Sequence, residues 1–396
     1  MQFKKIRNIF LVLAILSVVS LVSFRVGQGY KIIDKNELDL SMMWKVKDRL
    51  SSLYLDKNKI DKKSMEYGAI KGMVASIGDP YTVYLTPEEN KSSNEELEGE
   101  FGGVGISLGY KDGTLAVMTT LSDTPAERAG LKTNDLILKI VDKGNKVDKD
   151  TTGISLAEAV KLIRGKIGSE VILTMYREDK GKFDVVLKRD NIVVKSVELE
   201  WKELNGKKIA WVKLNKFSEN VFKEWPIVVN EIKNNEGNNF GGIVLDLRNN
   251  PGGYLEASVF VASDLISDGV VVKQDSTTGL TQEYKVDQSR RNLLKEKLVV
   301  LVNEGSASAS EILAGALKEY NRSKLVGKKT FGKGTVQQPE DFSDGSGLHV
   351  TIAKWLLPSG KNIHGEGVAA DIEVEAGTDA SKDLQLEKAM EVLNEK

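Results

Sequence analysis

The chain has 396 residues, no cysteine, two histidines and a formal net charge of −1 at pH 7. The absence of cysteine excludes disulfides, thiolate nucleophiles, cysteine-based zinc sites and a lipid anchor on cysteine. The near-zero net charge argues against nucleic acid as a partner. With only His349 and His364 and no HExxH pattern, we expect no metal site and no cofactor.

Residues 1–27 have the pattern of an export segment. Lys4, Lys5 and Arg7 precede an apolar run from Ile9 to Phe24, an order that leaves the basic end inside and sends the rest of the chain outward. The run is longer than most signal-peptide cores and slightly short for a spanning helix. We predict an uncleaved, single-pass signal-anchor in the cell membrane with the remainder extracytoplasmic. A cleaved signal peptide is the alternative.

Residues 36–98 are predicted to form an N-terminal helical segment. The spacing of apolar residues from Asn36 to about Ile77 indicates two amphipathic helices, which Gly78-Asp79-Pro80 ends. The polar, acidic stretch from Glu88 to Glu100 is interpreted as a linker. Because such helices need a partner for their apolar faces, either the core or a second subunit, we expect a homodimer.

Residues 99–190 are predicted to form a small separate domain, because short strands and two helices alternate over about ninety residues. The expected strands are Ile106–Leu108, Leu115–Thr120, Asp135–Val141, Val171–Tyr176 and Phe183–Leu187, and the expected helices are Ala126–Gly130 and Ser155–Ile163. A Gly-rich turn before the first strand can present N–H groups to the terminal carboxylate of a peptide that adds as a strand. Val104, Gly105 and Ile106 are the predicted contacts.

Residues 191–380 alternate strands and helices, which predicts an α/β core. The expected strands are Ile209–Val212, Gly242–Leu247, Val270–Lys273, Leu298–Val302 and His349–Trp355, and the expected helices are Val221–Ile232, Ala257–Ile266 and Ser308–Tyr320. Lys324–Gly327 leads into a further strand. Residues 381–396 are predicted to form a C-terminal helix from Asp383 to Leu393.

Three motifs in this core are candidates for chemistry. The first, Gly305-Ser306-Ala307-Ser308-Ala309-Ser310-Glu311, opens a helix, where N–H groups and the helix dipole stabilise developing negative charge; plain N-capping by serine is the alternative. The second is Phe331-Gly332-Lys333-Gly334-Thr335-Val336-Gln337. It is either a surface turn or, if the fold buries the amine, a neutral lysine base that Gln337 can orient. The third, Asp246-Leu247-Arg248-Asn249-Asn250-Pro251-Gly252-Gly253, lies at the end of a buried strand, where its two glycines let backbone N–H groups face a ligand oxygen or simply form a tight turn.

Together these motifs resemble those of the carboxyl-terminal processing peptidases, also called tail-specific proteases. The resemblance implies a nucleophile, a general base and an orienting amide at Ser308, Lys333 and Gln337. It also implies an oxyanion hole from the N–H of Ala309 and that of Gly252 or Gly253, a choice that the sequence leaves open.

The resemblance extends over nearly the whole chain after the anchor. It implies a crotonase-like α/β peptidase core with an inserted PDZ domain at about 99–190 and an N-terminal helical segment behind the membrane anchor. Asp79-Pro80-Tyr81-Thr82 looks like part of that N-terminal segment. The implied protein is a serine endopeptidase that cleaves exported or membrane-associated proteins and recognises their C-terminal tails through the PDZ domain.

Three other interpretations remain open from the residues. A histidine base would have to be His349 or His364. A membrane-tethered PDZ scaffold would bind tails without cleaving them. A coenzyme A-dependent enzyme could use the same crotonase-like fold, because fold alone does not fix chemistry. The combination of Ser308, Lys333 and Gln337 favours the peptidase.

Overall fold

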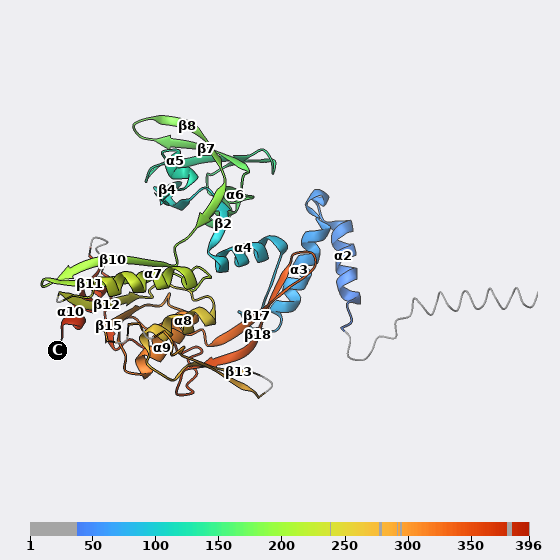
Figure 1. The fold of residues 1–396 in the computed structure, drawn as a ribbon. Coiled ribbons are helices and arrows are strands. Elements are labelled where there is room, and N and C mark those ends of the chain that lie inside the picture. Colours follow the sequence, from blue (N-terminus) through green and yellow to red (C-terminus); the bar gives the residue numbers. More distant parts are fainter. Residues whose placement is uncertain are drawn as a thin grey trace, which may run out of the picture. The chain divides into compact units, whose positions relative to one another are not determined.

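The computed structural model describes residues 38–237, 239–276, 279–290, 292–293, 295–377 and 382–395. The predicted signal-anchor at residues 1–27 lies outside these residues. Within the described ranges no helix is both long and apolar enough to cross a membrane. The chain divides after Ala69 into two units, which are described separately (Figure 1).

The first unit contains the two helices that the apolar spacing predicts. They are α2 (Ser41–Leu53) and α3 (Lys62–Ala75, which continues into the second unit), and a short 3-10 turn, η1 (Lys57–Lys59), precedes α3. Several large apolar side chains of α2 are exposed, among them Met42, Trp44 and Leu53. The helix therefore carries an apolar face that its own unit leaves uncovered.

The stretch interpreted as a linker is a helix, α4 (Pro87–Glu98), so that interpretation is wrong. Thr86 is its N-cap: the Thr86 N–H donates to the Glu89 carboxylate at 2.9 Å, and the Glu89 N–H donates back to the Thr86 hydroxyl at 3.4 Å. Pro87 occupies the first helical position, and Gly99 ends the helix with a φ of +78°. The sequence Thr-Pro-Glu-Glu has the pattern of a capping box, which predicts a helix start. The acidic composition of the stretch favoured a linker instead.

Residues 99–193 form a β-rich module with its own apolar core, centred on Leu115, Ile137, Leu173 and Met175. Its six-stranded sheet has the order β3-β4-β5-β7-β8, with β6 paired to β5. The strands are β3 (Ile106–Lys111), β4 (Thr114–Thr120), β5 (Leu136–Asp142), β6 (Val147–Asp150), β7 (Glu170–Arg177) and β8 (Gly181–Lys188), and the helices are α5 (Pro125–Arg128) and α6 (Leu156–Ile163). A two-stranded ladder of β2 (Glu100–Gly103) and β9 (Asp190–Val193) joins the two ends of the module.

The core is built on a six-stranded sheet of order β10-β11-β12-β15-β16-β19, parallel except at β10. Its strands are β10 (Val197–Leu204), β11 (Lys207–Leu214), β12 (Phe240–Asp246), β15 (Leu298–Val302), β16 (Lys324–Gly327) and β19 (Ile372–Glu373). The helices α7 (Val221–Asn234), α8 (Leu255–Leu265) and α9 (Ala309–Glu319) cover one face, and α10 (Leu384–Asn394) covers the other. Burial on both faces explains the continuous apolar runs of these strands.

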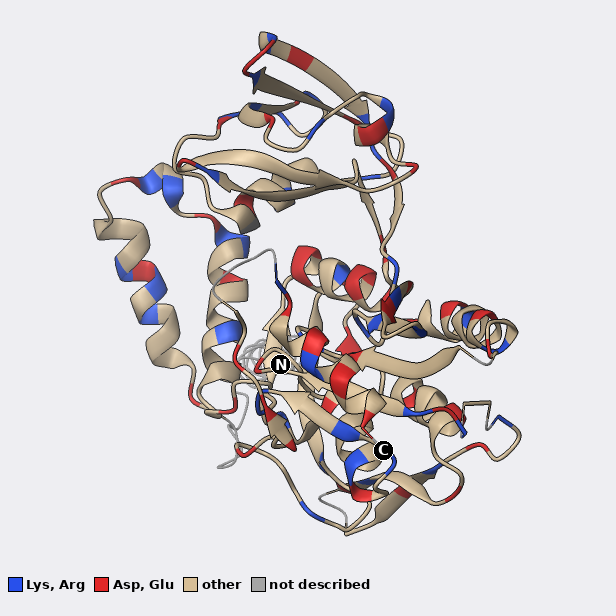
Figure 2. Cartoon of the chain, turned by 90° about the vertical axis from the view of Figure 1, so that its left-hand side faces the viewer, with Lys and Arg blue, Asp and Glu red and all other residues tan. Residues whose placement is uncertain are grey.

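A second sheet of order β1-β18-β13-β14, with β17 also paired to β18, stands beside the core. Its strands are β1 (Val83–Leu85), β13 (Val270–Ser276), β14 (Thr281–Lys285), β17 (Thr335–Asp341) and β18 (Gly347–Leu356). The pairing of β1 with β18 places the chain segment around Asp79 next to strands that are far away in the sequence. The predicted mixed α/β class is confirmed, and Figure 2 shows charges of both signs interspersed along the chain.

Candidate active site

The three sequence motifs lie in loops that follow neighbouring parallel strands. The Asn249–Gly253 loop follows β12, the Gly305–Ser308 loop follows β15, and the Phe331–Gly334 loop comes shortly after β16. Because β12, β15 and β16 are adjacent and parallel, their carboxyl ends meet at one edge of the sheet. Crevices at this edge are where α/β sheets commonly bind ligands.

Ser308 stands immediately before α9 with an unusual backbone, φ +55° and ψ −115°. A non-glycine residue is rarely found there, and the conformation costs on the order of 1–3 kcal/mol. Ser308 lines a cavity of ≈ 520 Å³ that Lys333, Gln337 and Gly253 also line. Ala309 begins α9, and within the described residues its N–H donates no hydrogen bond. It is thus a free donor directly next to Ser308.

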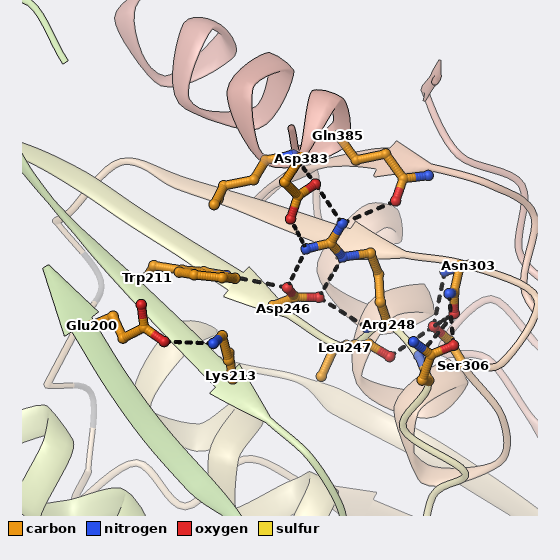
Figure 3. A network of polar contacts seen from close by, with 12 residues as sticks. Glu200, Trp211, Lys213, Asp246, Leu247, Arg248, Asn303, Ser306, Asp383 and Gln385 are labelled. Carbon is orange, nitrogen blue, oxygen red and sulfur yellow. Dashed lines mark hydrogen bonds and ion pairs between the residues drawn. The ribbon is translucent and has the colours of Figure 1, made fainter. Parts of the chain in front are cut away.

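Hydrogen bonds hold the serine loop against the glycine loop. The Ala307 N–H and the Ser310 hydroxyl both donate to the Asn250 carbonyl, at 3.0 and 2.9 Å. The Ser306 hydroxyl donates to the Leu247 carbonyl at 2.8 Å, as Figure 3 shows. These contacts fix the strained turn at Ser308 relative to the end of β12.

The two glycines of the third motif have different hydrogen-bonding states. The Gly252 N–H donates to the Asn250 side-chain oxygen at 2.9 Å. The Gly253 N–H makes no hydrogen bond within the described part of the chain. Of the two candidates that the sequence leaves open, Gly253 has the free donor and Gly252 has the close contact. A Cβ at Gly252 would lie 2.7 Å from the Ser308 Cβ and 2.8 Å from the Ala307 oxygen.

With Ser308 as the nucleophile of a peptidase, as the sequence motifs predict, Gly252→Ala is expected to lower kcat for peptide hydrolysis about tenfold or more by displacing Ser308. Gly206→Ala is the matched control, because Gly206 also has a positive φ of +75° but nothing within 4 Å of an added Cβ. Both variants suffer the backbone cost of a left-handed residue, about 1 kcal/mol. Steady-state assays and thermal melts separate the effects. Equal kcat values for the two variants would contradict the close-contact argument.

Lys333 is half-buried, and burial lowers the pKa of its amine below the ordinary lysine value, while the charges of Asp79 and Glu311 oppose that shift. Its Nζ lies 5.1 Å from the centre of the Tyr81 ring. Within the described residues the amine makes no hydrogen bond, and none joins it to Ser308. The two side chains line one cavity.

Glu311 has a central place that the sequence reasoning missed. Its side chain is fully buried and accepts hydrogen bonds from the N–H groups of Ser308 and Lys333 with one oxygen, both at 2.9 Å. The other oxygen accepts from the Gly332 N–H and the Thr330 hydroxyl, both at 2.6 Å. One carboxylate thus ties the serine loop to the lysine loop. The sequence shows that Glu311 follows Ser308 by three residues. It does not show that Glu311 binds residues 330–333, because that contact depends on the tertiary fold.

Gln337 and the two histidines lie close to these loops. The Gln337 amide donates to the hydroxyls of Thr335 and Thr351, at 3.0 and 3.1 Å, and no hydrogen bond joins it to Lys333 among the described residues. His349 lines the cavity, its Nε2 is buried without a partner within the described residues, and burial lowers its pKa. The His364 Nδ1 accepts from the Gly334 N–H at 3.3 Å. No hydrogen bond links either histidine to Ser308 among the described residues.

The beginning of the glycine loop is anchored to α10 through Arg248. Figure 3 shows the Arg248 guanidinium between Asp246 and Asp383, with Gln385 beside it. Its five N–H groups donate to these three side chains at 2.7 to 3.0 Å. Trp211 donates to Asp246 at 3.1 Å. The C-terminal helix therefore takes part in holding the end of β12, from which the glycine loop departs.

The predicted peptide-binding residues form a second, smaller cavity in the β-rich module. Val104, Gly105 and Ile106 line a space of ≈ 60 Å³ together with Val160 and Ile163 of α6. Gly105 has a φ of +77°, and the N–H groups of Val104 and Gly105 make no hydrogen bond within the described ranges. The neighbouring β3 is an edge strand of its sheet.

The chain is similar to known serine peptidases. Residues 208–374 match the model of "Peptidase family S41", and residues 26–89 match "Activating protease CtpB N-terminal domain". A "Probable CtpA-like serine protease" of Staphylococcus aureus (strain COL) is 39% identical over 373 residues, 92% of this chain and 70% of the relative. The "Carboxy-terminal processing protease CtpA" of Bacillus subtilis (strain 168) is 36% identical over 348 residues, 88% and 71% of the two chains. A solved photosystem II D1 C-terminal processing protease matches with a TM-score of 0.51 and 30% identity, covering 88% of this chain and 91% of the other.

Proposed function

We propose a catalytic pair for this chain, which belongs to the S41 family of serine-type, carboxyl-terminal processing endopeptidases. Ser308 is its nucleophile and Lys333 is its general base. The observation that carries this proposal is the shared cavity. A serine in a strained turn at a helix start and a partly desolvated lysine amine line the same space. Such serine–lysine pairs are an established variant of serine-peptidase chemistry.

The proposed reaction starts from the neutral amine of Lys333. As the Ser308 oxygen attacks the scissile carbonyl, Lys333 accepts the hydroxyl proton and then donates it to the leaving amine, and water releases the acyl-enzyme. The N–H groups of Ala309 and Gly253 stabilise the oxyanion. Neither N–H donates a hydrogen bond to another group within the described residues. Each such donor is worth about 3 kcal/mol of barrier.

No hydrogen bond joins Ser308 to Lys333 among the described residues, and this is compatible with the reaction, because catalytic hydrogen bonds are often long in unliganded enzymes and tighten on substrate binding. Gln337 is proposed to orient the amine in that closed arrangement. Thr335 and Thr351 both accept from its amide nitrogen, which fixes the plane of the amide and leaves its oxygen for Lys333.

Residues 99–190 are proposed to be a PDZ domain that captures the C-terminal tail of a protein substrate. The tail adds as a strand beside the free edge of β3, and its carboxylate is bound by the open N–H groups at Val104 and Gly105. The small cavity next to Ile106 and α6 then takes the last apolar side chain. Substrates are therefore proteins with exposed, apolar C-termini.

Two peptides of the same sequence test this tail recognition, one with a free C-terminal carboxylate and the other amidated. The free acid is expected to have a KM at least about tenfold lower, since the amidated tail loses charge-assisted hydrogen bonds worth about 1.5–3 kcal/mol. Steady-state cleavage at a shared internal bond provides the measurement. Equal KM values would remove the tail-recognition part of the proposal and leave the peptidase part standing.

We further propose that the protein is anchored by residues 1–27 and works on the extracytoplasmic side as a homodimer. The basic cluster followed by an apolar run supports the anchor. The exposed apolar side chains of α2 support self-association. Family membership disfavours both the inert scaffold and the coenzyme A-dependent enzyme as alternatives.

A further inference from the structure

The turn Asp79–Thr82 lies beside the Lys333 loop although some 250 residues separate them. The Tyr81 ring faces the Lys333 Nζ at 5.1 Å from its centroid. The same ring meets His364 in an edge-to-face arrangement, with 6.0 Å between the centroids, and His364 accepts from the Gly334 N–H. Tyr81 thus contacts both the amine and a residue bonded to the chain next to that amine.

This turn is held firmly by polar contacts. The Asp79 carboxylate accepts from the Tyr81 N–H at 3.0 Å and from the Thr82 hydroxyl at 2.7 Å. The Thr82 hydroxyl accepts from the Thr351 N–H at 3.1 Å, and the Thr351 hydroxyl accepts from the Gln337 amide. β1, which starts at the next residue, pairs with β18. The position of the ring is therefore set by the second sheet, not by a free loop.

The charges around the amine do not favour its neutral form overall. Asp79 from the turn and Glu311 from α9 both stabilise the ammonium, and His349 on β18 also faces the amine. His364, on the loop after β18, contacts the Tyr81 ring. The π face of the Tyr81 ring also favours the ammonium. Removal of water acts in the opposite direction, because desolvation disfavours a charged lysine, and it is the largest of these effects. Among the described residues, Tyr81 is the one aromatic residue whose ring lies against the Lys333 amine.

We propose that Tyr81 is a positioning residue of the active site, whose ring covers the Lys333 amine and keeps water away from it. The ring also limits where the amine can lie, so that it stays on the cavity side towards Ser308. This inference rests on the proposed role of Lys333 as the general base. It assigns a function to the Asp79–Thr82 turn that the catalytic proposal does not use.

The test compares the pH dependence of kcat/KM in the full chain and its variants. Its acidic limb reports the pKa of the base in the free enzyme. Tyr81→Ala and Tyr81→Gln admit water to the amine and also remove the ring that favours the ammonium. We expect the hydration of the charged form to outweigh the lost ring contact, so the pKa of Lys333 rises towards its ordinary value and the limb moves to higher pH. Tyr81→Phe keeps the ring and leaves the limb in place. The control is Tyr84→Leu, which alters a buried tyrosine of the same segment whose ring meets Phe342.

A second measurement needs no catalysis. In a Ser308→Ala background, mass spectrometry follows acetylation of Lys333 by acetic anhydride as a function of pH. The midpoint is expected to lie higher when Tyr81 is also replaced by alanine or glutamine. Unchanged midpoints and limbs in both Tyr81 variants would overturn the inference. Failure of the base assignment is seen separately, as turnover that survives in Lys333→Ala.

Discussion

Replacing Ser308 or Lys333 by alanine is expected to lower kcat for peptide hydrolysis at least about a thousandfold. Loss of either member of a nucleophile–base pair removes nearly all chemical acceleration and leaves only what binding and the oxyanion donors supply. The Lys333 amine donates to no described residue, and the Glu311 N–H that caps on the Ser308 hydroxyl also donates to the Ser308 carbonyl at 2.8 Å, so the fold is expected to survive both substitutions. Circular dichroism and thermal melts check folding, and a fluorogenic peptide gives kcat.

Lys329→Ala is the matched control for the lysine. It removes an exposed lysine four residues before Lys333 and should leave kcat within about twofold, since surface substitutions away from special features change little. The double variant His349→Ala with His364→Ala addresses the rival base. Retention of activity there, together with loss in Lys333→Ala, excludes a histidine mechanism. Near-normal turnover in Lys333→Ala would show that the base is assigned wrongly.

Replacing Glu311 by glutamine is expected to lower kcat about a hundredfold and to reduce the free energy of unfolding by about 2–4 kcal/mol. An amide nitrogen in place of one carboxylate oxygen faces two donors instead of accepting from them, and each lost buried hydrogen bond costs about 1–3 kcal/mol. Those donors include the N–H groups of Ser308 and Lys333, or of Gly332 with the Thr330 hydroxyl, depending on the amide orientation. The two catalytic loops then lose their shared anchor.

The pH profile separates this effect from general destabilisation. Because the Glu311 charge raises the pKa of Lys333, its removal lowers that pKa and moves the acidic limb of kcat/KM to lower pH. This is opposite in sign to the Tyr81→Ala shift. Glu304→Gln, in the same loop but exposed, is the control and should change neither kcat nor the limb. A limb that stays fixed in Glu311→Gln would contradict direct coupling to the base.

The apolar core elements could be predicted closely from the sequence. Leu298–Val302 is a strand with the expected bounds, because a run of five Leu and Val residues has the length and β-branched content of a strand buried on both faces. The helix after Ser308 and the C-terminal helix were equally clear. Elements with polar faces were missed. The last four residues of β17, Pro339 among them, are all exposed. The strand therefore lacks the alternation of apolar and polar residues by which a half-buried strand is recognised.

The candidate residues of the site could be named from the motifs, but their relations could not. Which glycine keeps a free N–H depends on where the Asn250 side chain points, and no local pattern encodes that. The role of Glu311 depends on partners about twenty residues further on, and that of Tyr81 on the pairing of β1 with β18. Such contacts are set by tertiary packing, which a single sequence does not display.

Covalent labelling follows the activation of Ser308 by a neutral Lys333. A fluorophosphonate is reacted with the enzyme over a pH series, and mass spectrometry locates the adduct and measures how fast it forms. We expect a single modified serine, Ser308, whose labelling rate rises with pH through a midpoint below the ordinary lysine pKa and collapses in Lys333→Ala. Labelling of another serine, or a rate at Ser308 that is undiminished in Lys333→Ala, would contradict it.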